Sequence, residues 1–135
     1  MAFRQDIGIG PDGARRSALV VASDAVARSV CRLALEACNW EVEIVDSGVA
    51  AVVAARRDAP AIIIIGLQLR DVPGREALGW LRSNPDLDGV PVVVIAGGSE
   101  DDDEVGRLAA NALLRRPVTQ QAVRRVVDSV TGRPV

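Results

Sequence analysis

The sequence contains no histidine, lysine or tyrosine, and its 135 residues include only one phenylalanine and two tryptophans. Without histidine, phosphohistidine transfer, catalytic triads built on histidine and histidine-ligated metal sites are excluded. All 16 basic residues are arginine, and 18 acidic residues bring the formal net charge to −2. This near balance of charge argues against a nucleic-acid partner, because such proteins depend on a basic field.

Long apolar runs are also missing from the sequence. No apolar stretch approaches the ~18 residues that cross a bilayer, so we expect no membrane association. Arg4 is followed by glycine, proline and aspartate rather than an apolar segment, which predicts no secretory signal peptide and a cytoplasmic location. Hydrophobic residues still make up 49% of the chain, and its length predicts one folded domain.

The two cysteines, Cys31 and Cys38, lie seven residues apart in a segment that the pattern predicts to be helical. Seven residues rise about 10 Å along a helix axis, whereas disulfide-linked Cα atoms lie within about 7 Å of each other. We therefore expect two free cysteines that pack as small hydrophobic side chains.

Short apolar segments alternate five times with amphipathic ones over residues 17–130, between a glycine-rich arm (1–16) and a short tail (131–135). The predicted strands are 17–21, 41–45, 61–65, 90–95 and 112–114. The predicted helices are 25–38, 47–58, 74–83, 101–109 and 119–130. Five β–α units predict an α/β fold, a doubly wound five-stranded parallel sheet with helices on both faces.

In such a sheet, ligands bind at the carboxyl ends of the strands. The residues expected at this edge are Ala22, Ser23, Asp46, Gly66, Ala96, Arg115 and Arg116. They offer neither a nucleophile beside a base nor a group of carboxylates. The sequence therefore predicts no catalytic centre, no metal site and no bound cofactor.

Five segments, in this order, resemble the landmarks of a response-regulator receiver domain. They are LVVASD (19–24), WEVEIVDSGVAAV (40–52), PAIIIIGLQLRDVPG (60–74), PVVVIAGG (91–98) and LLRRP (113–117). The resemblance covers residues 17–130 and implies a flavodoxin-like strand order of 2-1-3-4-5.

The same resemblance implies a degenerate phosphorylation pocket. The positions of the acidic pair that holds magnesium in the family are Ala22 and Ser23 here, and the phosphate-accepting aspartate matches Gly66. The hydroxyl residue that senses the phosphoryl group matches Ala96, and the lysine matches Arg116. Glycine has no nucleophilic atom, so the resemblance implies a pseudo-receiver that is not phosphorylated in the ordinary way.

The role of Arg116 has two interpretations. It pairs either with Asp24 or Asp71 inside the protein, or it binds an exogenous anion. For Asp24 we favour the N-cap of the first helix over a metal ligand. The family also implies a cis peptide bond between Arg116 and Pro117.

Three residues form a candidate interaction surface: Trp80, Arg124 and Arg125. Trp80 lies at the border of the buried stripe of its helix. Its side chain is therefore either partly buried over the edge of the core or exposed as a binding hot spot. Trp40 opens the second strand and is interpreted as structural.

These observations favour a phosphorylation-independent pseudo-receiver that acts as a protein–protein interaction module in bacterial two-component signal transduction. Its expected partner is another signalling protein or a second copy of the chain. The alternative is a sensor that binds a small anion or nucleotide in the pocket near Arg116, Gly97 and Gly98. An enzyme is disfavoured, because the sequence offers no nucleophile with a base.

Overall fold

The computed structural model describes residues 16–97 and 110–132. Five strands form one sheet in the order β2-β1-β3-β4-β5, and each neighbouring pair is parallel. The strands are β1 (Ser17–Val21), β2 (Glu41–Val45), β3 (Ile62–Gly66), β4 (Val92–Ala96) and β5 (Ala112–Arg115). The predicted fold class and strand order are confirmed.

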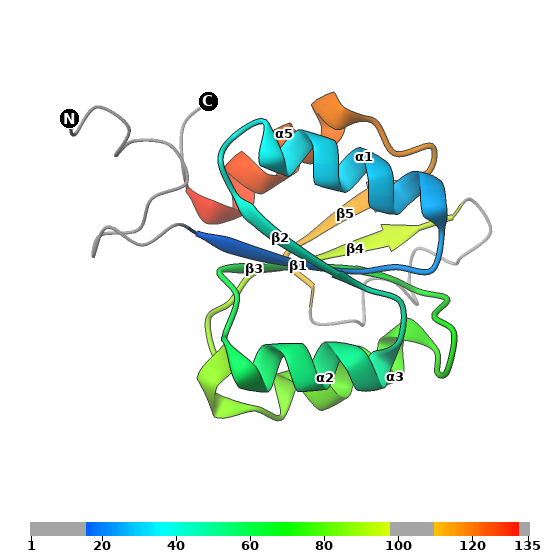
Figure 1. The fold of residues 1–135 in the computed structure, drawn as a ribbon, viewed down its shortest axis with the longest axis vertical. Coiled ribbons are helices and arrows are strands. Elements are labelled where there is room, and N and C mark those ends of the chain that lie inside the picture. Colours follow the sequence, from blue (N-terminus) through cyan, green and yellow to red (C-terminus); the bar gives the residue numbers. More distant parts are fainter. Residues whose placement is uncertain (1–15, 98–109, 133–135) are drawn as a thin grey trace.

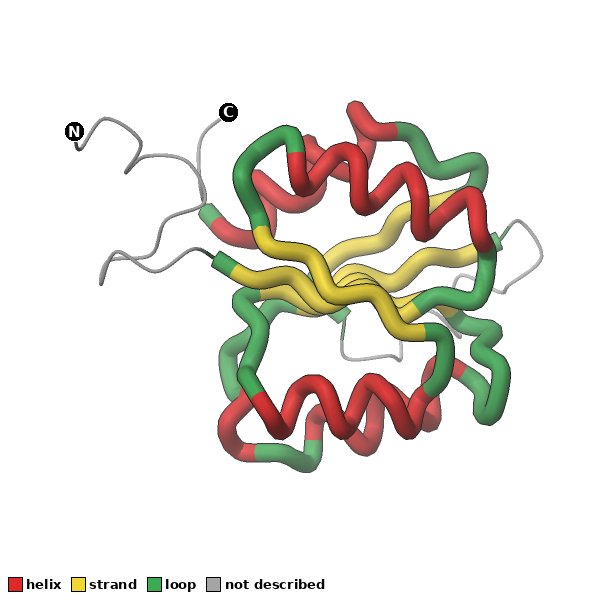
Figure 2. The backbone as a smooth tube through the Cα atoms, in the orientation of Figure 1, coloured by secondary structure: helices red, strands yellow, loops and turns green. Residues whose placement is uncertain are grey.

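The helices form two layers on opposite faces of this sheet (Figures 1 and 2). Helices α1 (Ala25–Glu36) and α5 (Gln120–Thr131) pack together on one face. Helices α2 (Gly48–Arg57) and α3 (Gly74–Arg82) pack together on the other, and a short 3₁₀ helix, η1 (Pro85–Leu87), follows α3. The predicted helix at 101–109 lies outside the described residues.

Polar side chains begin the helices as the sequence predicts. Asp24, Ser47 and Thr119 each accept a hydrogen bond from a backbone N–H in the first turn of α1, α2 and α5. Helix α1 ends at Glu36, two residues earlier than predicted. The reason is Asn39, whose φ of 64° turns the chain back into β2.

The central strand β3 is buried on both faces. Ile62 and Ile64 belong to the core under α1 and α5, whereas Ile63 and Ile65 belong to the core under α2 and α3. A strand covered on both sides needs apolar residues at every position, which explains the absence of alternation. The strand is shifted by one residue from the predicted 61–65, so that Gly66 is its last residue and pairs with Ile95.

Trp40 and both cysteines have the structural roles expected of them. Trp40 is buried in the core under α1 and α5, with the Arg16 guanidinium 5.3 Å from the centre of its ring. Cys31 is buried and Cys38 is half-buried, and both are free. Burial raises the pKa of the Cys31 thiol to about 11.

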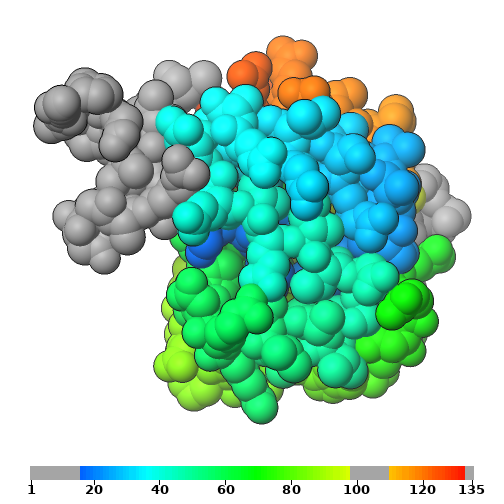
Figure 3. All heavy atoms as spheres, viewed as in Figure 1, coloured from blue at the N-terminus to red at the C-terminus, as the bar shows by residue number. Residues whose placement is uncertain are grey.

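The front of the molecule in Figure 3 is formed by β2 together with α1 and α2. Within residues 16–97 and 110–132, no helix is long and apolar enough to cross a bilayer. Of the predicted arm (1–16), only Arg16 lies within these ranges. Of the predicted tail (131–135), Thr131 is the last residue of α5 and Gly132 is its C-cap.

Gly74, the first residue of α3, provides a test of the packing between this helix and β3. A Cβ atom at Gly74 would lie 2.1 Å from the carbonyl oxygen of Gly66 and 2.7 Å from the Cα of Leu67. Because these are backbone atoms, we expect Gly74→Ala to lower the free energy of unfolding by about 1–3 kcal/mol in urea denaturation.

The matched control is Gly79→Ala in the same helix. A Cβ atom there would meet nothing within 4 Å. Removing a glycine from a helix interior stabilises by about 0.5–1 kcal/mol, so the two alanines should shift stability in opposite directions. Equal effects of the two substitutions would contradict the predicted close approach at Gly74.

Candidate functional site at the carboxyl edge of the sheet

The structure brings together small residues where β1, β3 and β4 end. Ala22 and Ala96 are buried, and a Cβ atom at Gly66 would lie 4.0 Å from the Cβ of Ala22. In the sheet register, Gly66 pairs with Ile95, and the next residue, Ala96, pairs with Arg115 of β5. The centre of this edge therefore carries no side chain that can act as a nucleophile, an acid or a base.

A cavity of about 340 Å³ opens at the same edge. Its lining consists of Ser23, Asp24, Leu67, Gln68, Ile95, Gly97 and Arg116. Of the five positions that the sequence identified, Ser23 and Arg116 line the cavity, whereas Ala22, Gly66 and Ala96 are buried beside it. The prediction that these residues share one edge is correct.

Asp24 and Arg116 form an ion pair across this cavity, and each side chain is about one-third exposed, at 34% and 35%. The second carboxylate oxygen of Asp24 accepts a hydrogen bond from the Val26 backbone N–H at 3.0 Å. Asp24 is thus the cap of α1, as predicted, and also the partner of Arg116, which is one of the alternatives that the sequence left open. The Arg116–Pro117 peptide bond is cis, which is also as predicted.

The environment of Asp24 favours its ionised form. Partial burial raises the pKa of this carboxyl, but the hydrogen bonds from Val26 and Arg116 and the positive charge of Arg116 outweigh it. The net pKa is below the ordinary value of 3.8. The pair is therefore charged at neutral pH.

Asp71 is not a partner of Arg116, and that alternative is wrong. Its carboxylate accepts hydrogen bonds from the backbone N–H groups of Gly48 at 2.7 Å, Val49 at 3.1 Å and Val72 at 2.9 Å. The first N–H groups of a helix have no partner within the helix, so they attract a nearby carboxylate. The bond from Gly48 in particular holds the pKa of Asp71 below its usual value, despite the opposing effect of desolvation.

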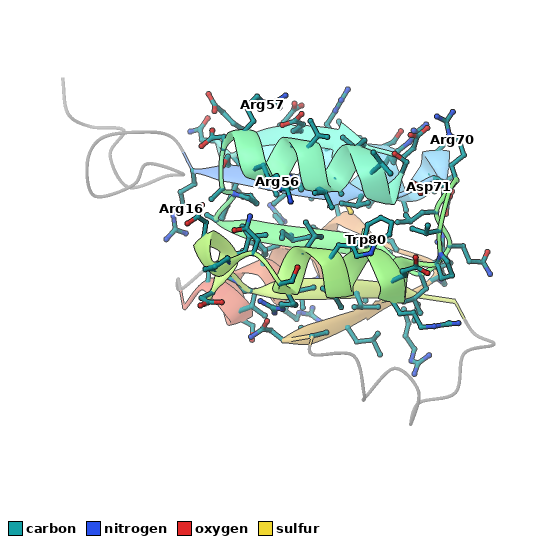
Figure 4. The ribbon with its side chains drawn as sticks, turned by 90° about the horizontal axis from the view of Figure 1, so that it is seen from below. Arg16, Arg56, Arg57, Arg70, Asp71 and Trp80 are labelled. Atoms are coloured by element: carbon teal, nitrogen blue, oxygen red, sulfur yellow. The ribbon has the colours of Figure 1, made fainter. Side chains whose placement is uncertain are left out.

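Further polar contacts join the loops at this edge. The Ser23 hydroxyl donates to the Gln68 carbonyl at 2.8 Å, and Arg70 forms an ion pair with Asp46 at 3.6 Å. Figure 4 shows Arg70 and Asp71 together near the first turn of α2. Together with the Asp24–Arg116 pair, these contacts connect the loops that follow β1, β2, β3 and β5.

Sequence reasoning did not find the contacts of Gln68, Asp46 and Arg70. Ser23 and Gln68 are 45 residues apart, and no periodic pattern marks a hydroxyl that bonds a distant carbonyl. Among the described residues, no three acidic or cysteine side chains lie close enough together to hold a metal ion.

The candidate interaction surface made of Trp80, Arg124 and Arg125 is not one surface. Trp80 lies on α3, whereas both arginines are exposed on α5, on the opposite face of the sheet. Trp80 is 37% exposed, so its ring is partly buried and partly open to solvent. Helical spacing placed each residue on the outside of its own helix but did not relate the two helices.

No protein-family model matches the chain. The chain is 31% identical over 100 residues to the transcriptional regulatory protein TcrX of Mycobacterium tuberculosis. That alignment covers 73% of this chain and 42% of TcrX, so the chain spans less than half of that relative. It is 24% identical over 119 residues to the polar-differentiation response regulator DivK of Brucella ovis, covering 87% of this chain and 97% of DivK.

The fold is also similar to solved receiver structures over most of the chain. A crystal structure of a response regulator from Chloroflexus aurantiacus superposes with a TM-score of 0.80 at 20% identity, covering 87% of this chain and 98% of that one. The sheet order 2-1-3-4-5 is that of the flavodoxin-like class of α/β folds. The chain is similar in sequence to response regulators and has the fold of solved receiver domains.

The Asp24–Arg116 pair yields a stability prediction with a defined pH dependence. We expect Arg116→Ala to lower the free energy of unfolding at pH 7 by about 1 kcal/mol, because both partners are partly exposed to solvent screening. The pKa of Asp24 is lower in the folded state than its ordinary value of 3.8. The stability that the ion pair contributes is therefore present above pH 3.8 and is lost as the pH falls through the pKa of the folded state.

Urea denaturation at several pH values between 7 and 3 measures this effect. The difference between the wild type and Arg116→Ala should shrink toward zero at the acid end. Arg125→Ala on the exposed face of α5 is the control and should change stability by less than about 0.5 kcal/mol at every pH. A difference that grows on acidification would contradict the assigned pairing.

Proposed function

We propose that the chain is a receiver domain that works without phosphorylation, as a cytoplasmic protein–protein interaction module in bacterial two-component signalling. The observation that carries this proposal is Gly66 at the carboxyl end of β3, where the family resemblance expects the phosphate-accepting aspartate. A glycine offers no atom to attack a phosphoryl donor. Its partner is a signalling protein or a second copy of the chain, and the chain itself performs no catalysis.

The residues around Gly66 do not fit the magnesium ion that the family uses. Magnesium requires several oxygen ligands in near-octahedral geometry. Ala22 supplies none, and Ser23 donates its hydroxyl hydrogen to Gln68. Asp24 already accepts hydrogen bonds from Arg116 and Val26. This competition for the nearest carboxylate supports a pocket that is organised by an internal ion pair.

The proposed mechanism follows from the contacts that join the loops. In a two-state protein, a ligand changes the population only through a difference in affinity between the states. Here Asp24 neutralises the positive charge of Arg116 within the protein, so no phosphoryl group is needed to neutralise it. The surface around this edge is then presented to a partner in one fixed state.

Incubation with acetyl phosphate and magnesium tests the proposal. We expect intact-mass spectrometry to show no added phosphoryl group on the wild-type chain. The positive control is Ala22→Asp, Ser23→Asp, Gly66→Asp, which restores the acidic pair and the acceptor together. A Cβ atom at Gly66 would lie 3.7 Å from the Val21 carbonyl oxygen, an ordinary contact, so the first side-chain atom of an aspartate fits there.

The triple variant should gain an acid-labile phosphoryl group at position 66. Circular dichroism shows whether it is folded, which separates a failed restoration from a failed fold. A phosphoryl group on the wild-type chain within residues 60–74 would contradict the proposal.

The sensor alternative is supported by the 340 Å³ cavity that Arg116 lines. A ligand present at about 100 times its dissociation constant stabilises the folded state by about 2.7 kcal/mol. Thermal denaturation with inorganic phosphate, acetyl phosphate and nucleotides therefore distinguishes the two functions. The interaction module predicts no shift, whereas a shift that Arg116→Ala abolishes would favour the sensor.

A further inference from the structure

Helix α2 exposes an apolar ridge that no part of the described chain covers. Val49 and Val53 are 59% and 57% exposed, and their spacing of four residues places them on one face of the helix. Arg56 follows Val53 by three residues and therefore shares this face. The helix contains no acidic residue, so this surface is apolar with a positive charge at its end.

Helix α3 adds an aromatic ring and a negative charge on the same side of the molecule. Trp80 lies against the first turn of α2, because a Cβ atom at Gly48 would be 3.2 Å from its Cζ3 atom. Glu76 precedes Trp80 by one turn on the same face of α3 and is exposed. Figure 4 looks onto this surface and shows Trp80 between the two helices. We name these residues the α2–α3 face: Val49, Val53, Arg56, Glu76 and Trp80.

The two charges of the α2–α3 face have no ion pair with any residue that the structure describes. Arg57, the neighbour of Arg56, does pair with Glu43 at 2.6 Å. Arg56 lies eight residues beyond Gly48, about 12 Å along α2. Glu76 lies nearly level with Gly48, because a Cβ atom at Gly48 would be 3.0 Å from the Cβ of the next residue, Ala77. The two helices run in the same direction, because both return from the carboxyl edge of a parallel sheet. Arg56 and Glu76 are therefore too far apart to pair within one chain.

We propose that the α2–α3 face binds the same face of a second copy of this chain, related by a two-fold axis. This inference rests on the proposed function as an interaction module and specifies its partner. The axis lies in the face, perpendicular to the line from Arg56 to Glu76 and through the midpoint of that line. It places Arg56 opposite Glu76 of the partner subunit, and the symmetry forms the reciprocal pair as well.

The centre of the face suits this arrangement. The midpoint lies about 5 Å beyond Gly48 along α2, between the levels of Val49 and Val53, and Trp80 lies at about the same level on α3. Apolar side chains thus meet around the axis, and the two ion pairs lie at the rim. Specific interfaces usually have apolar and aromatic residues at the centre and charged residues at the rim, and the α2–α3 face has this arrangement.

Sedimentation equilibrium of the purified full chain from micromolar to millimolar concentration tests the proposal. We expect a reversible dimer, and we expect Val53→Asp to raise its dissociation constant at least tenfold, because each substitution occurs twice in the interface. The matched control is Val26→Asp on α1, where the valine is 66% exposed on the opposite face of the sheet. This variant should leave the dissociation constant within twofold of the wild-type value.

Charge reversal then tests the pairing itself. Arg56→Glu and Glu76→Arg should each weaken the dimer at least tenfold, and the double variant should restore it to within about threefold of the wild type. These positions are exposed, and circular dichroism checks that each variant is folded. Restoration by the double variant requires direct pairing and would not follow from a change in helix stability.

Three results would overturn the proposal: a chain that is monomeric at millimolar concentration, a dimer that Val26→Asp breaks and Val53→Asp does not, or a double charge reversal that fails to restore binding. A monomeric chain that resists acetyl phosphate would leave the proposed function intact. A dimer that accepts a phosphoryl group would instead contradict the proposed function alone.

Discussion

Burial of β3 on both faces is the constraint on which the rest of the structure depends. Four consecutive isoleucines alternate between two separate cores, so neither helical layer can be removed without exposing half of the strand. Each core is closed by a pair of helices, α1 with α5 and α2 with α3. The parallel arrangement also gathers every strand end at one edge, and this gathering creates the candidate site.

At that edge, polar contacts join loops that lie far apart in the sequence. Small residues end β1, β3 and β4, and the cavity beside them is crossed by an arginine and an aspartate from loops 92 residues apart. Asp71 provides a second link by capping α2 from the loop after β3. The carboxylates of Asp24, Asp46 and Asp71 at this edge thus serve helix ends and ion pairs.

The strands and helices could be predicted because their signals are local. Apolar runs, caps such as Ser47 and Thr119, and the breaking effect of Asn84 and Pro85 depend on near neighbours in the chain. The sequence also indicates that Arg116 can pair with an aspartate at the same edge, but it leaves Asp24 and Asp71 as alternatives. The family resemblance supplied the strand order, which periodicity alone does not determine.

The remaining errors concern relations between distant segments. Asp71 and Arg116 both follow strands, which makes them possible partners by sequence, but the Asp71 carboxylate binds the first N–H groups of α2 instead. The sequence predicts Trp80 and the arginines of α5 to be on the outside of their own helices, but it does not show which side of the sheet each helix covers. The sequence alone does not show which side chain binds the unpaired N–H groups at the start of a helix.

The edge position of β2 has a consequence for how copies of this chain can associate. Glu41 and Glu43 lie on the exposed side of this strand, and Arg57 binds one of them. A second β2 strand added alongside would bring these carboxylates close to their counterparts, and charged side chains on an edge strand oppose such pairing. Extension of the sheet at β2, the usual route from an open edge to aggregation, is thereby discouraged.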